Sequence, residues 1–228
     1  MSAPRVIHAR EPARVASALL ATAIARVQER KTGPRLAIPG GSALAALGPA
    51  RAGLGSIWSG VRLTWVDERC VSEADAASNR GEAYRAGALR LDRPPAAELP
   101  LYLFPESPRS AVARVEATFD ECFEGALDVL LLGMGEDGHI ASLFPENGVR
   151  ADARVAHVRG SPKPPAERIT LTLPLLATAR EAILMVTGES KREALNRLLE
   201  GDPALPATHL TGLVVVTDLQ LEDSSRGR

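Results

Sequence analysis

The sequence predicts an α/β fold with a mostly parallel sheet, and three observations lead to this prediction. Apolar runs of strand length alternate along the chain with segments of helical periodicity. The run at 126–135 is almost continuously apolar, which is typical of a central parallel strand covered on both faces. Glycine-rich or charged residues follow several of these runs directly, as expected where the carboxyl ends of parallel strands form a site.

Seven segments are predicted to be strands. The stretch 35–42 combines a short buried strand with a glycine turn, and 60–69 is a strand that ends in charged residues. The remaining strands are expected at 99–104, 126–135, 168–173, 181–188 and 212–218. The last of them closes the predicted sheet.

Three helices are predicted from periodicity and end signals. The first spans 13–30, and its apolar stripe comprises Val15, Leu19, Ala23 and Val27. The second occupies 107–125, with a Ser-Pro start and a glycine end. The third occupies 190–201, where Ser190 and Glu193 have the spacing of a capping box.

Length and composition narrow the possible functions. The chain of 228 residues fits a single domain over 1–228, with room for a small lobe, and the polar tail at 222–228 is expected to fray. A net charge of −1 argues against non-specific nucleic-acid binding, which requires a basic surface. The sequence contains neither a signal-peptide pattern nor an apolar run of membrane-spanning length, which predicts a cytoplasmic protein without membrane contact.

The two cysteines do not indicate a metal site. Cys70 and Cys122 lie far apart, with no C-x-x-C and no clustered histidines. We expect both to be reduced thiols, and we expect neither structural zinc nor another bound metal.

The glycine-rich loop at 133–139 allows two interpretations. Its glycines spell G-x-G-x-x-G after an apolar run, which is the dinucleotide-binding fingerprint. That fingerprint requires an acidic residue about 20 positions further on, but 155–160 reads VAHVRG. The alternative is a sharp turn that directs Asp137 and His139 into a cleft for proton transfer. We favour this second interpretation and expect no cofactor, although His139 could instead cap a following helix.

Several further residues are candidates for binding an anion. Lys191 lies at a predicted helix start, where a cation is unfavourable because it opposes the helix dipole. A phosphate bound between the lysine and the helix N–H groups would offset this, although the side chain could simply be solvated. The turn at 40–42 offers backbone N–H groups for an anion. Arg69 could bind a phosphate or pair with Asp67, and Lys163 lies in a stiff proline-rich loop that could equally be surface.

Together these segments resemble the 6-phosphogluconolactonase family. The matching stretches are IPGGS, WVDERCV with the following SN, DVLLLGMGEDGHIASLFPEN, SPKPPAERITLTLPLL and VTGESKREAL, in the family's order over residues 35–200. The resemblance implies a Rossmann-like three-layer α/β/α sandwich of the sugar-phosphate isomerase/CoA-transferase type.

The resemblance also implies a reaction, the hydrolysis of 6-phospho-D-glucono-1,5-lactone to 6-phosphogluconate in the oxidative pentose phosphate pathway. His139 would be the general base, Asp137 would orient it or hold sugar hydroxyls, and backbone N–H groups of the glycine loop would stabilise the oxyanion. The implied partner is the small phosphosugar lactone, bound by a monomer or small homo-oligomer. The implied substrate- or phosphate-binding residues are Gly40, Gly41, Ser42, Asp67, Arg69, Gly135, Lys163, Arg168 and Lys191.

Two other functions remain open on the same residues. Glucosamine-6-phosphate deaminases carry a similar loop that continues as AFNEP, whereas here Ser142, Leu143 and Phe144 follow the alanine and the deaminase glutamate has no counterpart. A regulator that binds sugar phosphates without catalysis is the second alternative. The chain also departs from the lactonase pattern, with Ala43 and Leu44 in place of the usual Thr-Pro and SNRGEAY in place of Ser-Asn-Tyr.

Overall fold

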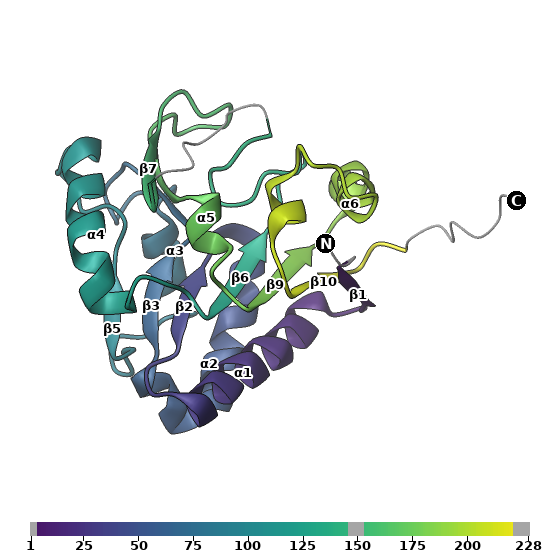
Figure 1. Ribbon diagram of the computed structural model, residues 1–228, viewed down its shortest axis with the longest axis horizontal. Helices are drawn as coiled ribbons and strands as arrows, with labels where there is room; N and C mark the ends of the chain where they lie inside the picture. Colours follow the sequence, from purple (N-terminus) through teal and green to yellow (C-terminus); the bar gives the residue numbers. More distant parts are fainter. Residues whose placement is uncertain (1–3, 146–152, 221–228) are drawn as a thin grey trace, which may run out of the picture.

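The larger of two sheets has seven strands in the order β1-β10-β9-β6-β2-β3-β5, and every pairing in it is parallel. A computed structural model describes residues 4–145 and 153–220 of the chain (Figure 1). The strands of this sheet are β1 (Arg5–His8), β2 (Arg35–Ile38), β3 (Arg62–Trp65), β5 (Ala97–Leu99), β6 (Val129–Gly133), β9 (Glu181–Val186) and β10 (Leu213–Thr217). The predicted α/β fold with a mostly parallel sheet is confirmed.

The strand order reverses direction between β2 and β6. From β2 the chain proceeds outward through β3 and β5, and from β6 it proceeds outward on the other side through β9 and β10. In open α/β sheets ligands bind beyond the carboxyl ends of the strands at such a switch point. The glycine turn after β2 and the loop at 133–139 after β6 therefore face each other across this position.

A second sheet has three antiparallel strands in the order β4-β8-β7. They are β4 (Asp67–Arg69), β8 (Arg168–Leu171) and β7 (Val155–Val158). The single strand predicted at 60–69 is therefore wrong, because the chain changes sheets at Val66. The Val66 N–H still donates to Ile38 O at 2.8 Å, whereas the Val66 carbonyl accepts from Leu171 N at 2.9 Å. This switch turns Asp67 and Arg69 away from the main sheet.

Helices flank the main sheet. Figure 1 shows α1 and α2 together on one side and α5 and β7 on the other. The helices are α1 (Pro12–Arg30), α2 (Leu47–Leu54), α3 (Asn79–Arg85), α4 (Pro108–Phe123), α5 (Leu173–Leu176) and α6 (Arg192–Leu199), with 3₁₀ segments at Gly41–Ala46, Gly55–Gly60, Glu189–Lys191 and Pro206–His209. No helix within 4–145 or 153–220 is both long and apolar enough to cross a membrane.

The helix predictions hold in outline and differ in detail. The buried face of α1 is centred on Ala16, Leu20 and Ile24, whereas the predicted Val15 and Leu19 are only half-buried at its margin. α4 is capped as expected, because Ser107 Oγ accepts from Ser110 N at 3.1 Å. The predicted capping box of the third helix is wrong. A 3₁₀ segment precedes α6, whose first cap residue is Lys191 and has no side-chain cap bond.

The predicted strand ends also needed correction. β5 covers only Ala97–Leu99, so most of the strand expected at 99–104 is irregular. β10 does not close the sheet, because β1 pairs along its outer side. β1 has only four residues, all of them partly exposed, and its sequence pattern is therefore too short to predict a strand. The single-domain expectation stays a prediction, and the tail at 222–228 lies outside the described residues.

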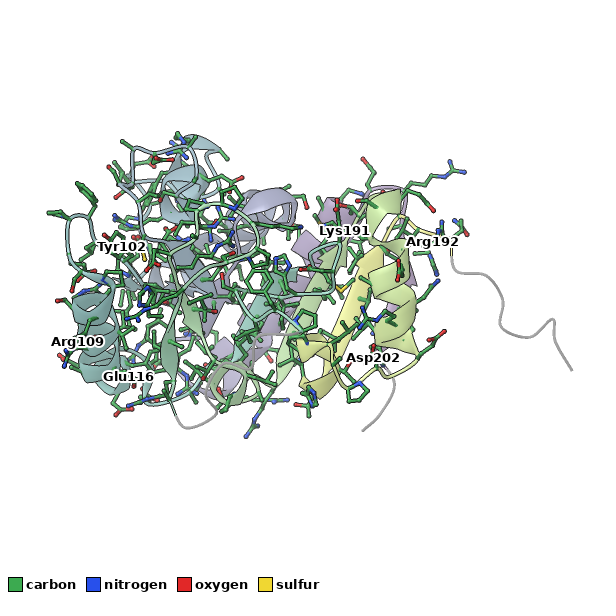
Figure 2. All side chains as sticks on the ribbon, turned by 90° about the horizontal axis from the view of Figure 1, so that it is seen from above. Tyr102, Arg109, Glu116, Lys191, Arg192 and Asp202 are labelled. Atoms are coloured by element: carbon green, nitrogen blue, oxygen red, sulfur yellow. The ribbon has the colours of Figure 1, made fainter. Side chains whose placement is uncertain are left out.

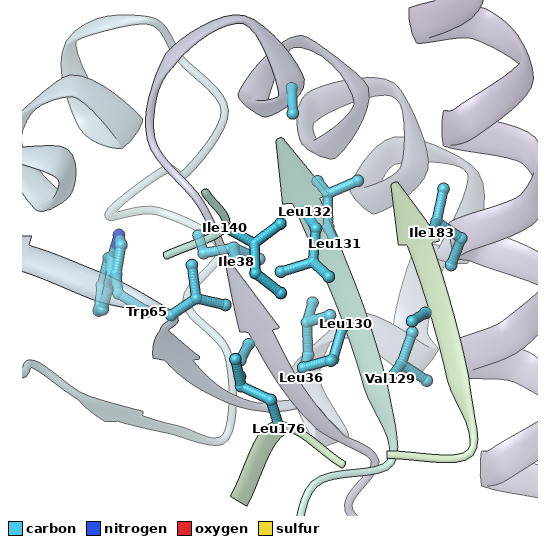
Figure 3. Packing of buried hydrophobic residues seen from close by; sticks show 14 of the residues in the cluster. Leu36, Ile38, Trp65, Val129, Leu130, Leu131, Leu132, Ile140, Leu176 and Ile183 are labelled. Carbon is cyan, nitrogen blue, oxygen red and sulfur yellow. The ribbon is translucent and has the colours of Figure 1, made fainter. Parts of the chain in front are cut away.

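The apolar core extends beneath the loop after β6. Leu36 and Ile38 of β2 and Leu130–Leu132 of β6 are fully buried. Ile140, from the loop itself, joins them in the same cluster (Figure 3). Burying a side chain of this size contributes about 1.5–3 kcal/mol, so the core anchors the segment that carries Asp137 and His139.

The cysteines are free, as predicted. Cys70 and Cys122 are both half-buried. Burial, with nearby carboxylates, raises the pKa of the Cys70 thiol to about 12, so this thiol stays protonated near neutral pH.

Candidate active site

A cavity of about 330 Å³ opens at the switch point between β2 and β6. Ten of the eleven predicted site residues line it: Gly40, Gly41, Ser42, Asp67, Arg69, Gly135, His139, Lys163, Arg168 and Lys191. The eleventh, Asp137, contacts His139. A larger cavity of about 560 Å³ lies at the opposite end of the sheet, beside the first residues of β1 and β10, and contains none of these residues.

The loop after β6 holds Asp137 and His139 as a pair. Asp137 Oδ1 lies 2.5 Å from His139 Nδ1 and also accepts the His139 backbone N–H at 3.3 Å. Gly135 N donates to His139 O at 2.8 Å, and Gly138 N donates to Gly135 O at 3.1 Å. No helix follows His139 within the described residues up to 145, so the helix-capping alternative is wrong.

Two glycines of this loop are needed for different reasons. A Cβ on Gly135 would lie 2.1 Å from His139 Nδ1 and 2.5 Å from Asp137 Oδ1. Gly138 has a φ of +86°, which side chains rarely adopt, and a Cβ there would meet Leu205 at 2.5 Å. The glycines therefore close the turn around the Asp–His pair. The N–H groups of Gly135 and Gly138 are used inside the turn, so neither is available to a substrate oxyanion.

The protonation state of His139 follows from its surroundings. Burial lowers the pKa of His139, and this effect outweighs the hydrogen bond that Asp137 accepts from the ring, which raises the pKa. The charge of Lys163 lowers the pKa of His139 further. Burial is the largest single influence on the pKa of Asp137 and raises it, but the hydrogen bonds and the charge of His139 together outweigh burial and leave that pKa below its ordinary value. Near pH 7 the imidazole is therefore neutral. Because Nδ1 faces a carboxylate, we assign the proton to Nδ1, which leaves Nε2 able to accept one.

Cationic side chains reach the same cavity from separate elements. Lys191, at the start of α6 (Figure 2), donates from Nζ to Met134 O. Burial lowers the pKa of Lys191, and the neighbouring charge of Lys163 lowers it further. Arg69 donates from one terminal nitrogen to Ala77 O at 2.6 Å, and its buried Nε has no partner within the described residues.

The alternative of an Asp67–Arg69 ion pair is not realised among the described residues, because Asp67 has other partners. Ser142 Oγ donates to Asp67 Oδ2 at 2.6 Å, and Asn79 Nδ2 donates to Asp67 Oδ1 at 3.1 Å. Ser142 and Asn79 are buried, and the sequence reasoning did not select either of them. Their positions inside the SN and ASLFP stretches were the available signal.

Arg168 is directed into the protein. It is 3% exposed, and it donates to Lys163 O at 2.7 Å and to Pro165 O at 3.1 Å. Its guanidinium also lies 3.8 Å from Asp67 Oδ2. Burial lowers its pKa, against the raising effect of Asp67. These contacts favour a role in holding the Lys163 loop over direct contact with a ligand.

A backbone N–H of the glycine turn after β2 already donates a hydrogen bond within the protein. Gly41 has a φ of +68°, and its N–H donates to Glu82 Oε2 at 2.9 Å. A Cβ on Gly40 would lie 2.0 Å from Asn79 Oδ1, so the turn and α3 approach each other closely. Within the described residues, no group of three or more His, Cys, Asp or Glu is arranged to hold a metal ion.

Comparisons with known proteins agree with this geometry. The family model for glucosamine-6-phosphate isomerases/6-phosphogluconolactonase matches residues 8–216. A 6-phosphogluconolactonase of Streptomyces coelicolor is 37% identical over 206 residues, which cover 83% of this chain and 79% of the relative.

Solved structures show the shared fold. A 6-phosphogluconolactonase of Thermotoga maritima superposes with a TM-score of 0.75 at 22% identity, covering 95% of this chain and 99% of that one. A monomeric glucosamine-6-phosphate deaminase superposes with a TM-score of 0.73 at 19% identity, covering 93% and 96%. The fold alone therefore does not separate the two activities.

Proposed function

The chain belongs to the glucosamine-6-phosphate isomerase/6-phosphogluconolactonase family, and on this premise we propose that it hydrolyses 6-phospho-D-glucono-1,5-lactone to 6-phosphogluconate. This reaction is a step of the oxidative pentose phosphate pathway. The observation that carries the proposal is a neutral, carboxylate-bound His139 that lines the same cavity as Arg69, Lys163 and Lys191. A proton acceptor beside a group of cations fits an ester that carries a phosphate.

The chemistry requires one activated water. His139 Nε2 takes a proton as the water oxygen bonds to the lactone carbonyl carbon, and Asp137 stabilises the imidazolium that forms. The tetrahedral intermediate then breaks its bond to the ring oxygen, which receives the proton from His139. The product is the open-chain acid, and the base returns to its neutral state.

The substrate phosphate would be bound by Arg69, Lys163 and Lys191, with the turn at 40–42 and Gly135 lining the rest of the cavity. The buried Nε of Arg69, unpartnered within the described residues, is one donor that a phosphate oxygen would satisfy. Arg168 and Asp67 would be positioning residues. Arg168 would hold the loop of Lys163, and Asp67 would hold Ser142. We also propose a monomer or small homo-oligomer in the cytoplasm, which size-exclusion chromatography and cell fractionation would test.

A spectrophotometric assay on freshly generated lactone, corrected for spontaneous opening, tests the activity. We expect catalysed opening, and His139→Ala should lower kcat by about 10²–10⁴-fold with a smaller change in KM. Lys191→Ala should chiefly raise KM, because it removes a charge-assisted contact and leaves the base in place. Ammonia release from glucosamine 6-phosphate would instead identify a deaminase, and neither reaction would indicate a regulator. A His139→Ala enzyme with near wild-type turnover would refute the general-base role.

A further inference from the structure

One buried carboxylate of the second sheet has no role in the proposed reaction. Glu68, in the middle of β4, is 3% exposed. Among the described residues, the lining of the cavity at the switch point includes its neighbours Asp67 and Arg69 but not Glu68 itself. Burying an ionised carboxyl group is costly unless hydrogen bonds compensate for the lost water. Glu68 therefore needs several donors close to it.

Four donors surround the Glu68 carboxylate. Oε1 accepts the backbone N–H groups of Arg69 and Asn79, each at 2.7 Å. Oε2 accepts the N–H of Arg80 at 2.8 Å and the hydroxyl of Ser78 at 3.2 Å. Burial is the largest influence on the pKa of Glu68 and raises it, whereas the three backbone N–H groups lower it. Because each oxygen faces two donors, the ionised carboxylate is the form that fits this position.

These contacts fix both ends of Arg69. Its backbone N–H is bound by Glu68, and its guanidinium donates to Ala77 O at 2.6 Å. Ala77 directly precedes Ser78, the cap residue of α3, so Glu68 also fixes this carbonyl by holding the start of the helix. The result is an arginine in the cavity wall whose buried Nε has no partner within the described residues.

The same carboxylate holds a second residue of the cavity wall less directly. Asn79, whose backbone N–H is bound by Glu68, donates from Nδ2 to Asp67 O at 2.8 Å and to Asp67 Oδ1 at 3.1 Å. Asp67 also accepts from Ser142 Oγ at 2.6 Å, a contact that does not involve Glu68. Loss of the Glu68 carboxylate should therefore displace Arg69 more than Asp67.

We propose that Glu68 is a positioning residue that fixes the Arg69 guanidinium where it meets the phosphate of the ligand, without touching the ligand itself. The phosphate contact rests on the proposed function, whereas the fixed guanidinium belongs to the protein without ligand. The base His139 is held by Asp137 on the separate loop after β6. Glu68 should therefore affect KM more than kcat.

Lactone hydrolysis by Glu68→Gln tests the proposal. The variant keeps the shape of the side chain, but one oxygen becomes an NH₂ group that cannot accept from its two donors. We expect KM to rise about tenfold, as for a weakened charge-assisted contact, with little change in kcat. Should Glu68→Gln not fold, Ser78→Ala removes only one donor and should raise KM about two- to threefold.

The matched control is Asp128→Asn. Asp128 is another buried carboxylate that accepts a backbone N–H, from Arg35 at 2.9 Å, but it lies before the start of β6 and does not line the cavity among the described residues. This variant should lower Tm and leave KM unchanged. A Glu68→Gln enzyme that has a lowered Tm but a KM within twofold of wild type would overturn the proposal.

The double variant Glu68→Gln/Arg69→Ala tests the route of the effect. If Glu68 acts through Arg69, KM should be at most about twofold higher than in Arg69→Ala alone. A further tenfold rise would overturn the proposal, because Glu68 would then act independently of Arg69.

The ¹H–¹⁵N signal of Arg69 Nε, assigned by its absence from Arg69→Ala, provides a readout that needs no ligand. Its exchange with solvent should be at least about tenfold faster in Glu68→Gln than in the wild type, and unchanged in Asp128→Asn. Wild-type exchange in Glu68→Gln would overturn the proposal. If the wild-type protein does not open the lactone, the proposed function fails, and this exchange rate still decides whether Glu68 fixes Arg69.

Discussion

Gly135→Ala is expected to disable the Asp137–His139 pair by a single methyl group. The new Cβ would lie 2.1 Å from His139 Nδ1, whereas ordinary contact begins at 3.4 Å, so the ring has to move by about 1.3 Å. Gly135 is not among the glycines with a positive φ, so alanine brings no backbone strain there. The displacement breaks the Nδ1–Oδ1 contact of 2.5 Å and moves Nε2 from its working position.

The size of the effect follows from that displacement. A misplacement of about 1 Å costs about 10²-fold in rate, so kcat should fall by about that factor while KM changes little. Steady-state lactone hydrolysis measures both constants. Gly53→Ala is the control, because a Cβ at this position in α2 has no atom within 4 Å and should leave kcat unchanged.

The double variant Gly135→Ala/His139→Ala tests the route of the effect. If Gly135 acts through His139, the double variant should be no slower than His139→Ala alone, because the two changes remove the same function. A Gly135→Ala enzyme with turnover within twofold of wild type would refute the reasoning. So would a double variant that loses a further 10²-fold, because Gly135 would then act independently of the base.

Three further predictions follow from the surroundings of the site and of the sheet. kcat/KM should fall as pH drops through a midpoint below 6.5, because burial lowers the pKa of His139 and only the neutral ring accepts a proton. Asp137→Asn should move this midpoint lower still, since the carboxylate raises that pKa; an upward move would contradict the assignment. Arg168→Met should raise KM about tenfold by releasing Lys163, and a lower Tm with unchanged KM would limit Arg168 to a structural role. Asp128→Asn should lower the free energy of unfolding by about 3 kcal/mol, because the nearly buried carboxylate binds the Arg35 guanidinium at 2.9 Å. A urea titration whose midpoint does not shift would contradict this prediction.

The sequence predicted elements well where one local signal dominated. The apolar run of β6 and the Ser107 cap of α4 were both found as expected, since burial on two faces and a capping hydroxyl leave clear local patterns. It failed where tertiary contacts decided the outcome. β1 has only four residues and gains its place by pairing with β10, and the change of sheet at Val66 depends on a hydrogen bond from Leu171.

The candidate site shows the same division. Residue types at the ends of predicted strands were sufficient to select His139, Arg69 and Lys191, because parallel strands bring their carboxyl ends to one edge. They were not sufficient to assign partners. Asp67 binds Ser142, 75 positions away, and Arg168 turns inward to the carbonyl of Lys163.

By itself, therefore, the sequence determined the class of fold, the chemical groups of the site and the loop that bears the base, because each depends on neighbouring residues along the chain. The tertiary structure decided which of those groups face the cavity and which hold others in place. It placed β2 beside β6 and so brought the glycine turn and the His139 loop together. It also placed Glu82 on the Gly41 amide, a contact between residues 41 positions apart that only the packing of α3 against the turn could establish.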